Sequence, residues 1–273
     1  MKYFYLTLFA FVSFLAQPQS NIEKRKAEVV AEAKRMYESE MASWYGTDLF
    51  IAQFTDREKI GGYFSYINEN TPTCIFFDRS AEPQVLGSIT FNQDFDTKKA
   101  AVDLKTRKLS QLETKYLNLR AAALQVIQSD TIFKQYNNTN FNLVPLIGKK
   151  ENKVYVLTGA TKGNVAIYGN DYLITFNPDN KLKRAIRLHK TILPVEYGDP
   201  DKEIISVMHS HLPEMDDLMT ASDICTTMLY QKMAKWESLQ VISPKYVSTW
   251  DCKKNELTII SRKEWDKKIE AKP

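Results

Sequence analysis

Two of the chain's three histidines, His209 and His211, lie two residues apart in a short stretch that has the composition of a strand. Side chains at positions i and i+2 of a strand point to the same face. An acidic residue, Asp223, follows after a loop, at the start of a predicted helix. Imidazoles and carboxylates are suitable zinc ligands, so this spacing predicts that the three side chains meet around one ion.

Three protein ligands are typical of a catalytic zinc site, in which the fourth position is left for water. Zinc lowers the pKa of such a water toward neutrality and thereby makes it a nucleophile at ordinary pH. The cofactor that we predict is therefore Zn²⁺, and the reaction class is hydrolysis.

The motif resembles that of the JAMM (MPN-type, JAB-like) metalloproteases and isopeptidases. In that family His-x-His-Pro is followed by a serine and, three residues later, by an aspartate. Here residues 209–213 read His-Ser-His-Leu-Pro, and Thr220 precedes Asp223 by three positions. The order of expected elements is also similar over residues 151–260.

The resemblance implies that His209, His211 and Asp223 bind zinc and that Thr220 helps to hold the oxyanion. It also implies a catalytic glutamate seven residues before the glycine that closes the first strand.

The chain departs from the family at that glutamate. Counting back from Gly159 gives Asn152, whereas Glu151 is one residue away. A shift of one residue turns a strand side chain to the opposite face. Glu151 is therefore the candidate proton shuttle only if a bulge turns its side chain back toward the metal. Leu212 also displaces the proline by one position, and threonine replaces the serine.

Some of these residues have structural interpretations as well. Thr220 and Asp223 match a helix capping box, in which a hydroxyl and an acid three residues later bond to each other's backbone. The third histidine, His189, has no partner acid at a diagnostic spacing, and we interpret it as a surface or structural residue.

The first residues, 1–20, have the features of a secretory signal peptide. An early lysine precedes an apolar run from Tyr3 to Ala16, and a polar segment follows. The run is shorter than the roughly 20 residues of a membrane span. We therefore predict a periplasmic or secreted protein with no integral membrane span after signal removal; the alternative is an uncleaved anchor.

Composition places the chain among soluble globular proteins. A formal net charge of +4, with 26% charged residues, gives no reason to expect nucleic acid as a partner. The three cysteines, Cys74, Cys225 and Cys252, form no CxxC motif. We interpret them as structural, either with one disulfide and one free thiol or with no disulfide.

Periodicity predicts amphipathic helices over residues 21–44, 109–128 and 221–236. Short runs of aromatic and β-branched residues predict strands, those in the first half forming an antiparallel meander. These strands lie at 63–67, 73–77, 85–91, 153–158, 165–168, 172–176, 182–189, 204–211, 239–242, 246–250 and 257–260.

The predicted fold class is α+β, with a mixed or antiparallel sheet flanked by helices. The predicted organisation is a signal peptide (1–20), an N-terminal helix and β-meander region (21–136), a linker (137–150) and a JAMM-like, cytidine-deaminase-like domain (151–273). The linker is expected because its segment is rich in asparagine and lysine and contains a proline and a glycine.

The leading functional hypothesis is an exported zinc-dependent peptide or isopeptide hydrolase, acting on a peptide or protein substrate. The alternative is a non-catalytic envelope protein that retains a degenerate JAMM-like fold and binds another envelope protein. A carboxylate within one water's reach of the metal position would favour the hydrolase. If the three ligands are far apart, the resemblance is accidental.

Overall fold

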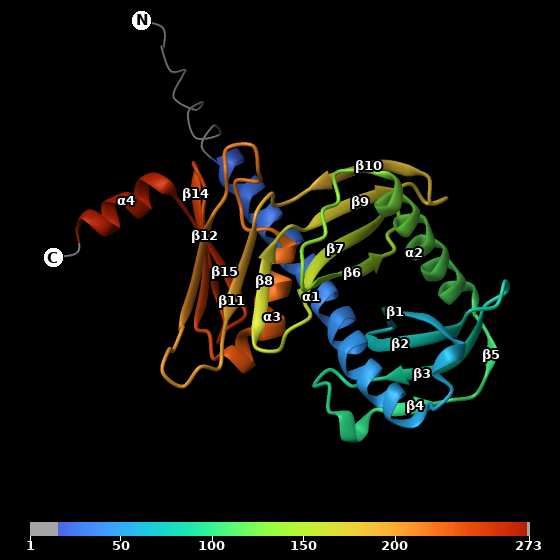
Figure 1. The fold of residues 1–273 in the computed structure, drawn as a ribbon. Helices are drawn as coiled ribbons and strands as arrows, with labels where there is room; N and C mark the ends of the chain where they lie inside the picture. The colour runs from blue at the N-terminus through green and yellow to red at the C-terminus, as the bar shows by residue number, and fades with distance from the viewer. Residues whose placement is uncertain (1–15, 272–273) are drawn as a thin grey trace, which may run out of the picture.

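The computed structural model describes residues 16–271, with side chains from residue 21 onward. The predicted signal peptide lies outside the described residues except for its last five, which begin α1. The helices are α1 (Ala16–Gln53), α2 (Gln111–Ser129), α3 (Ala221–Ala234) and α4 (Arg262–Glu270), with short 3-10 turns η1 (Arg57–Lys59) and η2 (Thr97–Lys99). The α+β class is confirmed (Figure 1).

The N-terminal sheet is the expected antiparallel meander. Its order is β1-β2-β3-β4, and β5 pairs with β3 beside β4. The strands are β1 (Ile60–Asn68), β2 (Thr71–Asp78), β3 (Gln84–Thr90), β4 (Ala101–Asp103) and β5 (Arg107–Lys108). Phe50 and Phe76 stack face to face with ring centroids 3.9 Å apart, which fixes the end of α1 on this sheet.

A second antiparallel sheet has the order β10-β9-β7-β6. Its strands are β6 (Thr139–Leu146), β7 (Asn152–Ala160), β9 (Tyr172–Phe176) and β10 (Leu182–Arg187). The linker predicted at residues 137–150 is therefore wrong, because β6 lies within it and pairs with β7 over its whole length. Pro145 fits there because β6 is an edge strand, where a missing N–H costs no ladder hydrogen bond.

The remaining strands lie toward the C-terminus. The strands β8 (Val165–Gly169) and β11 (Ile192–Glu196) form an antiparallel pair. A four-stranded sheet has the order β12-β13-β14-β15, with strands Ser206–Ser210, Ser238–Ile242, Tyr246–Asp251 and Glu256–Ser261. In this sheet β12 and β13 are parallel, and α3 provides the crossover that a parallel pair requires. The sheet is therefore mixed, as expected.

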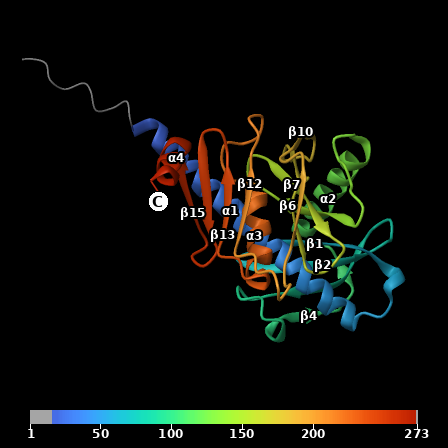
Figure 2. The ribbon, with the colours of Figure 1, turned by 60° about the vertical axis from the view of Figure 1, so that its left-hand side comes forward.

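The long helix α1 connects the two ends of the molecule. Figures 1 and 2 show it running from the sheet of β12–β15 to the sheet of β1–β4, and it packs against α3 on the way. It is longer than the helix predicted over residues 21–44. Among the described residues, no helix is both long and apolar enough to cross a membrane.

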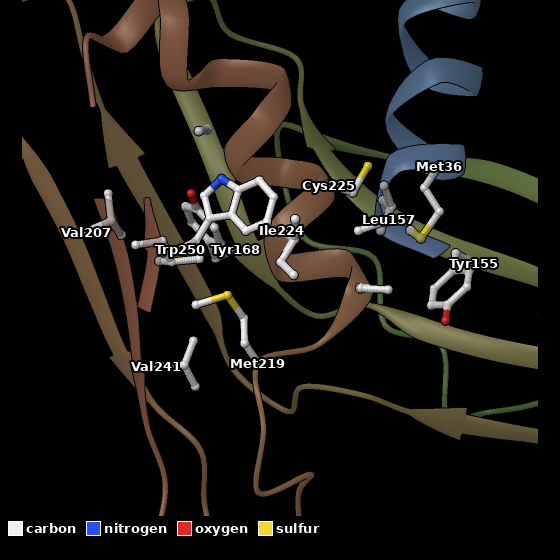
Figure 3. Close-up of a cluster of buried hydrophobic side chains, with 14 of the residues drawn as sticks. Met36, Tyr155, Leu157, Tyr168, Val207, Met219, Ile224, Cys225, Val241 and Trp250 are labelled. Atoms are coloured by element: carbon white, nitrogen blue, oxygen red, sulfur yellow. The ribbon is translucent and has the colours of Figure 1, made fainter. Parts of the chain in front are cut away.

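The largest core cluster lies around α3 (Figure 3). Ile224 lies near Trp250 of the C-terminal sheet, whereas Cys225 lies on the side of Met36 from α1. This packing seats α3 between α1 and the C-terminal sheet. The three cysteines are free and buried. Burial raises the pKa of the Cys74 thiol to about 12, which agrees with a structural role.

Candidate metal centre

Four side chains from three parts of the fold converge beneath the C-terminal sheet. His209 lies in β12, His211 directly follows that strand, and Asp223 lies in the first turn of α3. The fourth, His189, comes from the loop between β10 and β11. One nitrogen of each imidazole and one carboxylate oxygen lie within 4.8 Å of one another, so this group could hold a metal ion.

The contacts within the group are close. His189 Nε2 lies 2.9 Å from His211 Nε2 and 3.5 Å from Asp223 Oδ2. His211 Nε2 lies 3.4 Å from the same oxygen, and His209 Nε2 lies 3.2 Å from Asp223 Oδ1. His189, His211 and Asp223 are each no more than 3% exposed. The group is therefore shielded from water as well as compact.

Two of the rings are held from outside by hydrogen bonds that define their tautomers. His189 Nδ1 donates to Asp171 Oδ1 at 2.6 Å, and His211 Nδ1 donates to the Asp216 carbonyl oxygen at 2.7 Å. A carbonyl or carboxylate oxygen can only accept, so in the neutral rings both protons lie on Nδ1. In that state the two Nε2 lone pairs face each other across 2.9 Å, which is repulsive unless a proton or a metal ion lies between them.

The third ring, His209, carries an unsatisfied polar group. Among the residues that the structure describes, neither of its buried nitrogens makes a well-aligned hydrogen bond, although Nε2 lies 3.2 Å from Asp223 Oδ1. Leaving a buried polar group unpaired costs free energy, and native structures rarely do so without a reason. A proton between His189 and His211 would leave both nitrogens of this ring without a partner, whereas a metal ion could take one nitrogen from each ring and an oxygen of Asp223.

Several of the separations are those of ligand atoms around a small metal ion. Zinc–nitrogen bonds of about 2.0–2.1 Å in a tetrahedron place ligand atoms roughly 3.3 Å apart. The four contacts given above, between 2.9 and 3.5 Å, lie on either side of this separation. The outward bonds to Asp171 and to the Asp216 carbonyl are those that commonly orient metal-binding histidines.

Asp223 serves two roles with its two oxygens. Thr220 caps α3, and its backbone N–H and hydroxyl both donate to Asp223 Oδ2, at 2.9 and 2.8 Å. The Asp223 N–H donates in return to the Thr220 hydroxyl, so the predicted capping box is confirmed. Asp223 Oδ1 takes no part in the cap and faces His209.

Charges in the group shift its pKa values in opposite directions. Burial alone would raise the pKa of Asp223, but His189 and His209 hold it well below its ordinary value. Burial would lower the pKa of His189, yet Asp171 and Asp223 outweigh that effect and raise it well above the ordinary value. The site is thus arranged to stabilise positive charge.

A tight turn positions the outer carboxylate and the loop that carries His189. Gly169 has φ of +78°, and a Cβ at this position would lie 2.2 Å from the Thr191 carbonyl oxygen. Only glycine therefore allows β8 to come this close to the His189 loop. In the same turn Asn170 donates its backbone N–H to that oxygen, at 2.9 Å, and Asp171 follows directly.

The interpretation of His189 as a surface or structural residue is wrong, because it is buried and belongs to the group. No spacing in the sequence links His189 to the His209 motif. The available signal is only that Asp171, in a turn, precedes a histidine that follows the next two strands, β9 and β10. The structure brings His209, His211 and Asp223 together, and Thr220 with them.

Glu151 does not join this group. It lies just before β7, is partly exposed, and pairs with Lys183 at 3.3 Å. The adjacent Asn152 is buried and donates to the Asn180 side chain at 3.0 Å. The strand begins in regular register with β6 and β9, so no bulge redirects Glu151.

A cavity of about 330 Å³ reaches one side of the centre. His189 and His209 lie in its wall, together with Tyr168 of β8 and Met208 and Met215 beside them. A small molecule or an extended side chain could therefore approach the two rings. No protein-family model, curated protein or solved structure matches this chain.

Proposed function

We propose that this chain is an exported zinc-binding protein with a JAMM-like C-terminal domain, in which His189, His209, His211 and Asp223 hold the ion. The observation that carries the proposal is the 2.9 Å contact between two Nε2 atoms whose rings both donate outward from Nδ1. The three imidazoles and one carboxylate favour zinc over calcium or magnesium, which prefer oxygen ligands.

The geometry favours a binding or structural role for the centre over hydrolysis. Four protein ligands close a tetrahedral site, whereas catalytic zinc keeps one position open. Glu151 pairs with Lys183, and Asp171, which contacts the group, is occupied by His189. The partner proposed for such a protein is another protein of the cell envelope.

A JAMM-like hydrolase acting on peptide or isopeptide bonds is the second candidate. It is favoured by the cavity beside His189 and His209. In this version His209, His211 and Asp223 hold zinc, which supplies Lewis acidity and an acidified water. His189, oriented by Asp171, would take the place of the family's glutamate as the general base.

The metal itself is tested by elemental analysis of the full chain, purified without chelators and after reconstitution with zinc. We expect one zinc per chain, and a loss of stoichiometric zinc in Asp223→Asn and His211→Ala. Asp179→Asn, at an exposed turn, is the matched control and should retain the ion. Wild-type protein that takes up no stoichiometric zinc would contradict the proposal.

The two candidates differ in what His189 does. Cobalt substitution reports the coordination number through the intensity of visible absorption bands. If His189 is a ligand, His189→Ala changes the cobalt spectrum, and the wild type releases no product from peptide or isopeptide substrates. If it is a base, the spectrum keeps its form, and the variant abolishes a chelator-sensitive cleavage that the wild type performs.

A further inference from the structure

A second cavity, of about 440 Å³, lies beside the C-terminal half of α1. Its walls come from α1, β1, β6, α3 and the turn between β7 and β8. None of its lining residues also lines the cavity beside the metal centre. Whatever binds here therefore does not contact the histidines.

One residue in this cavity is a carboxylate without a cation. Glu40 of α1 is half-buried, and its closest polar contact is a long one, from Asn142 Nδ2 at 3.4 Å. Within residues 16–271 it makes no ion pair. Burial raises the pKa of Glu40 to about 7, and Asn142 offsets this only in part. Buried carboxylates are usually paired, so this one lacks a partner.

The surroundings of Glu40 are rich in aromatic rings. Trp44 of α1 packs at a tilt against Tyr230 of α3, with centroids 5.9 Å apart, and Tyr197 continues the series 5.8 Å from Tyr230. Tyr63 of β1 completes the wall. Trp44 and Tyr63 are 40% and 37% exposed, unusually high for large aromatic residues, so their surfaces are available to a ligand.

Aromatic faces and a carboxylate share a preference for cations. The electron-rich face of a tryptophan or tyrosine attracts an ammonium group, most strongly where water is excluded. Burial raises the pKa of Tyr63 and of Tyr230 to about 12, and the nearby Glu40 adds to this, so both rings are uncharged at ordinary pH. The negative charge beside the aromatic wall therefore comes from carboxylates: Asp48, and Glu40, which with a pKa of about 7 is partly ionised at neutral pH.

We propose that this cavity is a binding site for an organic ammonium ion, with Glu40 as the counter-ion and Trp44, Tyr63, Tyr197 and Tyr230 as the wall. The cation would provide the pairing that Glu40 lacks within the chain. Asp48, on the same helix as Glu40, adds a second negative charge to the cavity wall. Lys162 lines the cavity too and makes no ion pair within the described residues. The inference is independent of the zinc centre.

The test compares cations with uncharged molecules of similar shape, using the zinc-loaded full chain. n-Butylammonium is paired with n-butanol, and tetramethylammonium with tert-butanol, and binding is measured by ligand-observed NMR. We expect at least one cation to bind about tenfold more tightly than its uncharged counterpart. Equal binding of cation and alcohol, tighter binding of a neutral sugar such as methyl glucoside, or no binding of either cation would overturn the proposal.

Variants of α1 assign the binding to this cavity. Glu40→Gln keeps the shape and an acceptor for Asn142 but removes the charge, so it should abolish the preference for the cation. Glu38→Gln is the matched control, because Glu38 lies on the same helix and lines a different cavity. Glu40→Gln should keep its zinc and a melting temperature no lower than that of the wild type. A preference for the cation that persists in Glu40→Gln would show that Glu40 is not the counter-ion and would overturn the proposal.

Discussion

His189 Nε2 and His211 Nε2 lie 2.9 Å apart although the two rings come from different loops, 22 residues apart in the chain. Each ring is turned by a hydrogen bond behind it, from His189 to Asp171 and from His211 to the Asp216 carbonyl. The outer partners thus aim both lone pairs at one point. This relationship places His189 in the centre and supports a closed set of four ligands.

The carboxylate behind His189 should tune metal affinity without touching the ion. Asp171→Asn keeps an acceptor for Nδ1 but removes the charge that makes the ring a better ligand. We expect zinc affinity to fall by about 10- to 100-fold, measured by competition with a chromophoric chelator. Asp179→Asn serves as the control. An unchanged affinity in Asp171→Asn would show that His189 is not a zinc ligand.

Gly169 should be required for both stability and metal binding. Alanine there would need a left-handed backbone conformation and would bring its Cβ to 2.2 Å from the Thr191 carbonyl oxygen. We expect Gly169→Ala to lower the free energy of unfolding by more than about 1 kcal/mol and to weaken zinc binding. Gly163→Ala is the control, because a Cβ there meets nothing within 4 Å. If both variants behave like the wild type, this turn does not position the His189 loop.

Thr220 should contribute to stability through its hydroxyl. Thr220→Ala removes both the cap of α3 and a donor to Asp223 Oδ2, and should cost about 1 kcal/mol in urea unfolding. Thr220→Ser keeps the hydroxyl and should recover most of that loss. The capping interpretation fails if serine is as destabilising as alanine.

Glu40 should make stability depend on pH in a characteristic direction. Its pKa in the fold, about 7, is raised from the ordinary value of 4.5, so the fold favours the protonated form. The contribution of this group to stability is full below pH 4.5 and declines as pH rises to about 7, by at most about 3 kcal/mol. Denaturant unfolding of the wild type and Glu40→Gln, without added ligand, isolates this slope by difference. Parallel curves from pH 4.5 to 7 would show that Glu40 is not desolvated.

The sequence predicts those site residues whose positions depend on neighbouring parts of the chain, and not those brought in by long-range contacts. His209 and His211 share a strand face, and Asp223 begins the next helix, so their convergence follows from spacing alone. His189 was missed because its place depends on the approach of β8 to the loop after β10, a long-range contact. Glu151 is a candidate only from its distance along one strand to Gly159. In the structure its side chain faces Lys183 and not the metal centre.

The fold shows the same limit. Most strands and the helices α2 and α3 follow from local composition and spacing. One face of α2 is buried, whereas the first two turns of α3 are buried on every side. The composition of β6 predicts a linker because Pro145 and its polar neighbours are typical of loops. An edge strand tolerates a proline and polar side chains. α4 is not among the predicted helices: it has no buried residue, and its capping box of Ser261 and Glu264 is its main local signal.

The central claim is tested most directly by anomalous diffraction from crystals of the zinc-loaded chain, recorded on both sides of the zinc absorption edge. We predict one strong anomalous peak per chain, within bonding distance of the three His189, His209 and His211 Nε2 atoms and of an Asp223 oxygen. A chain that crystallises with zinc in the medium but shows no peak among these four side chains would contradict the account.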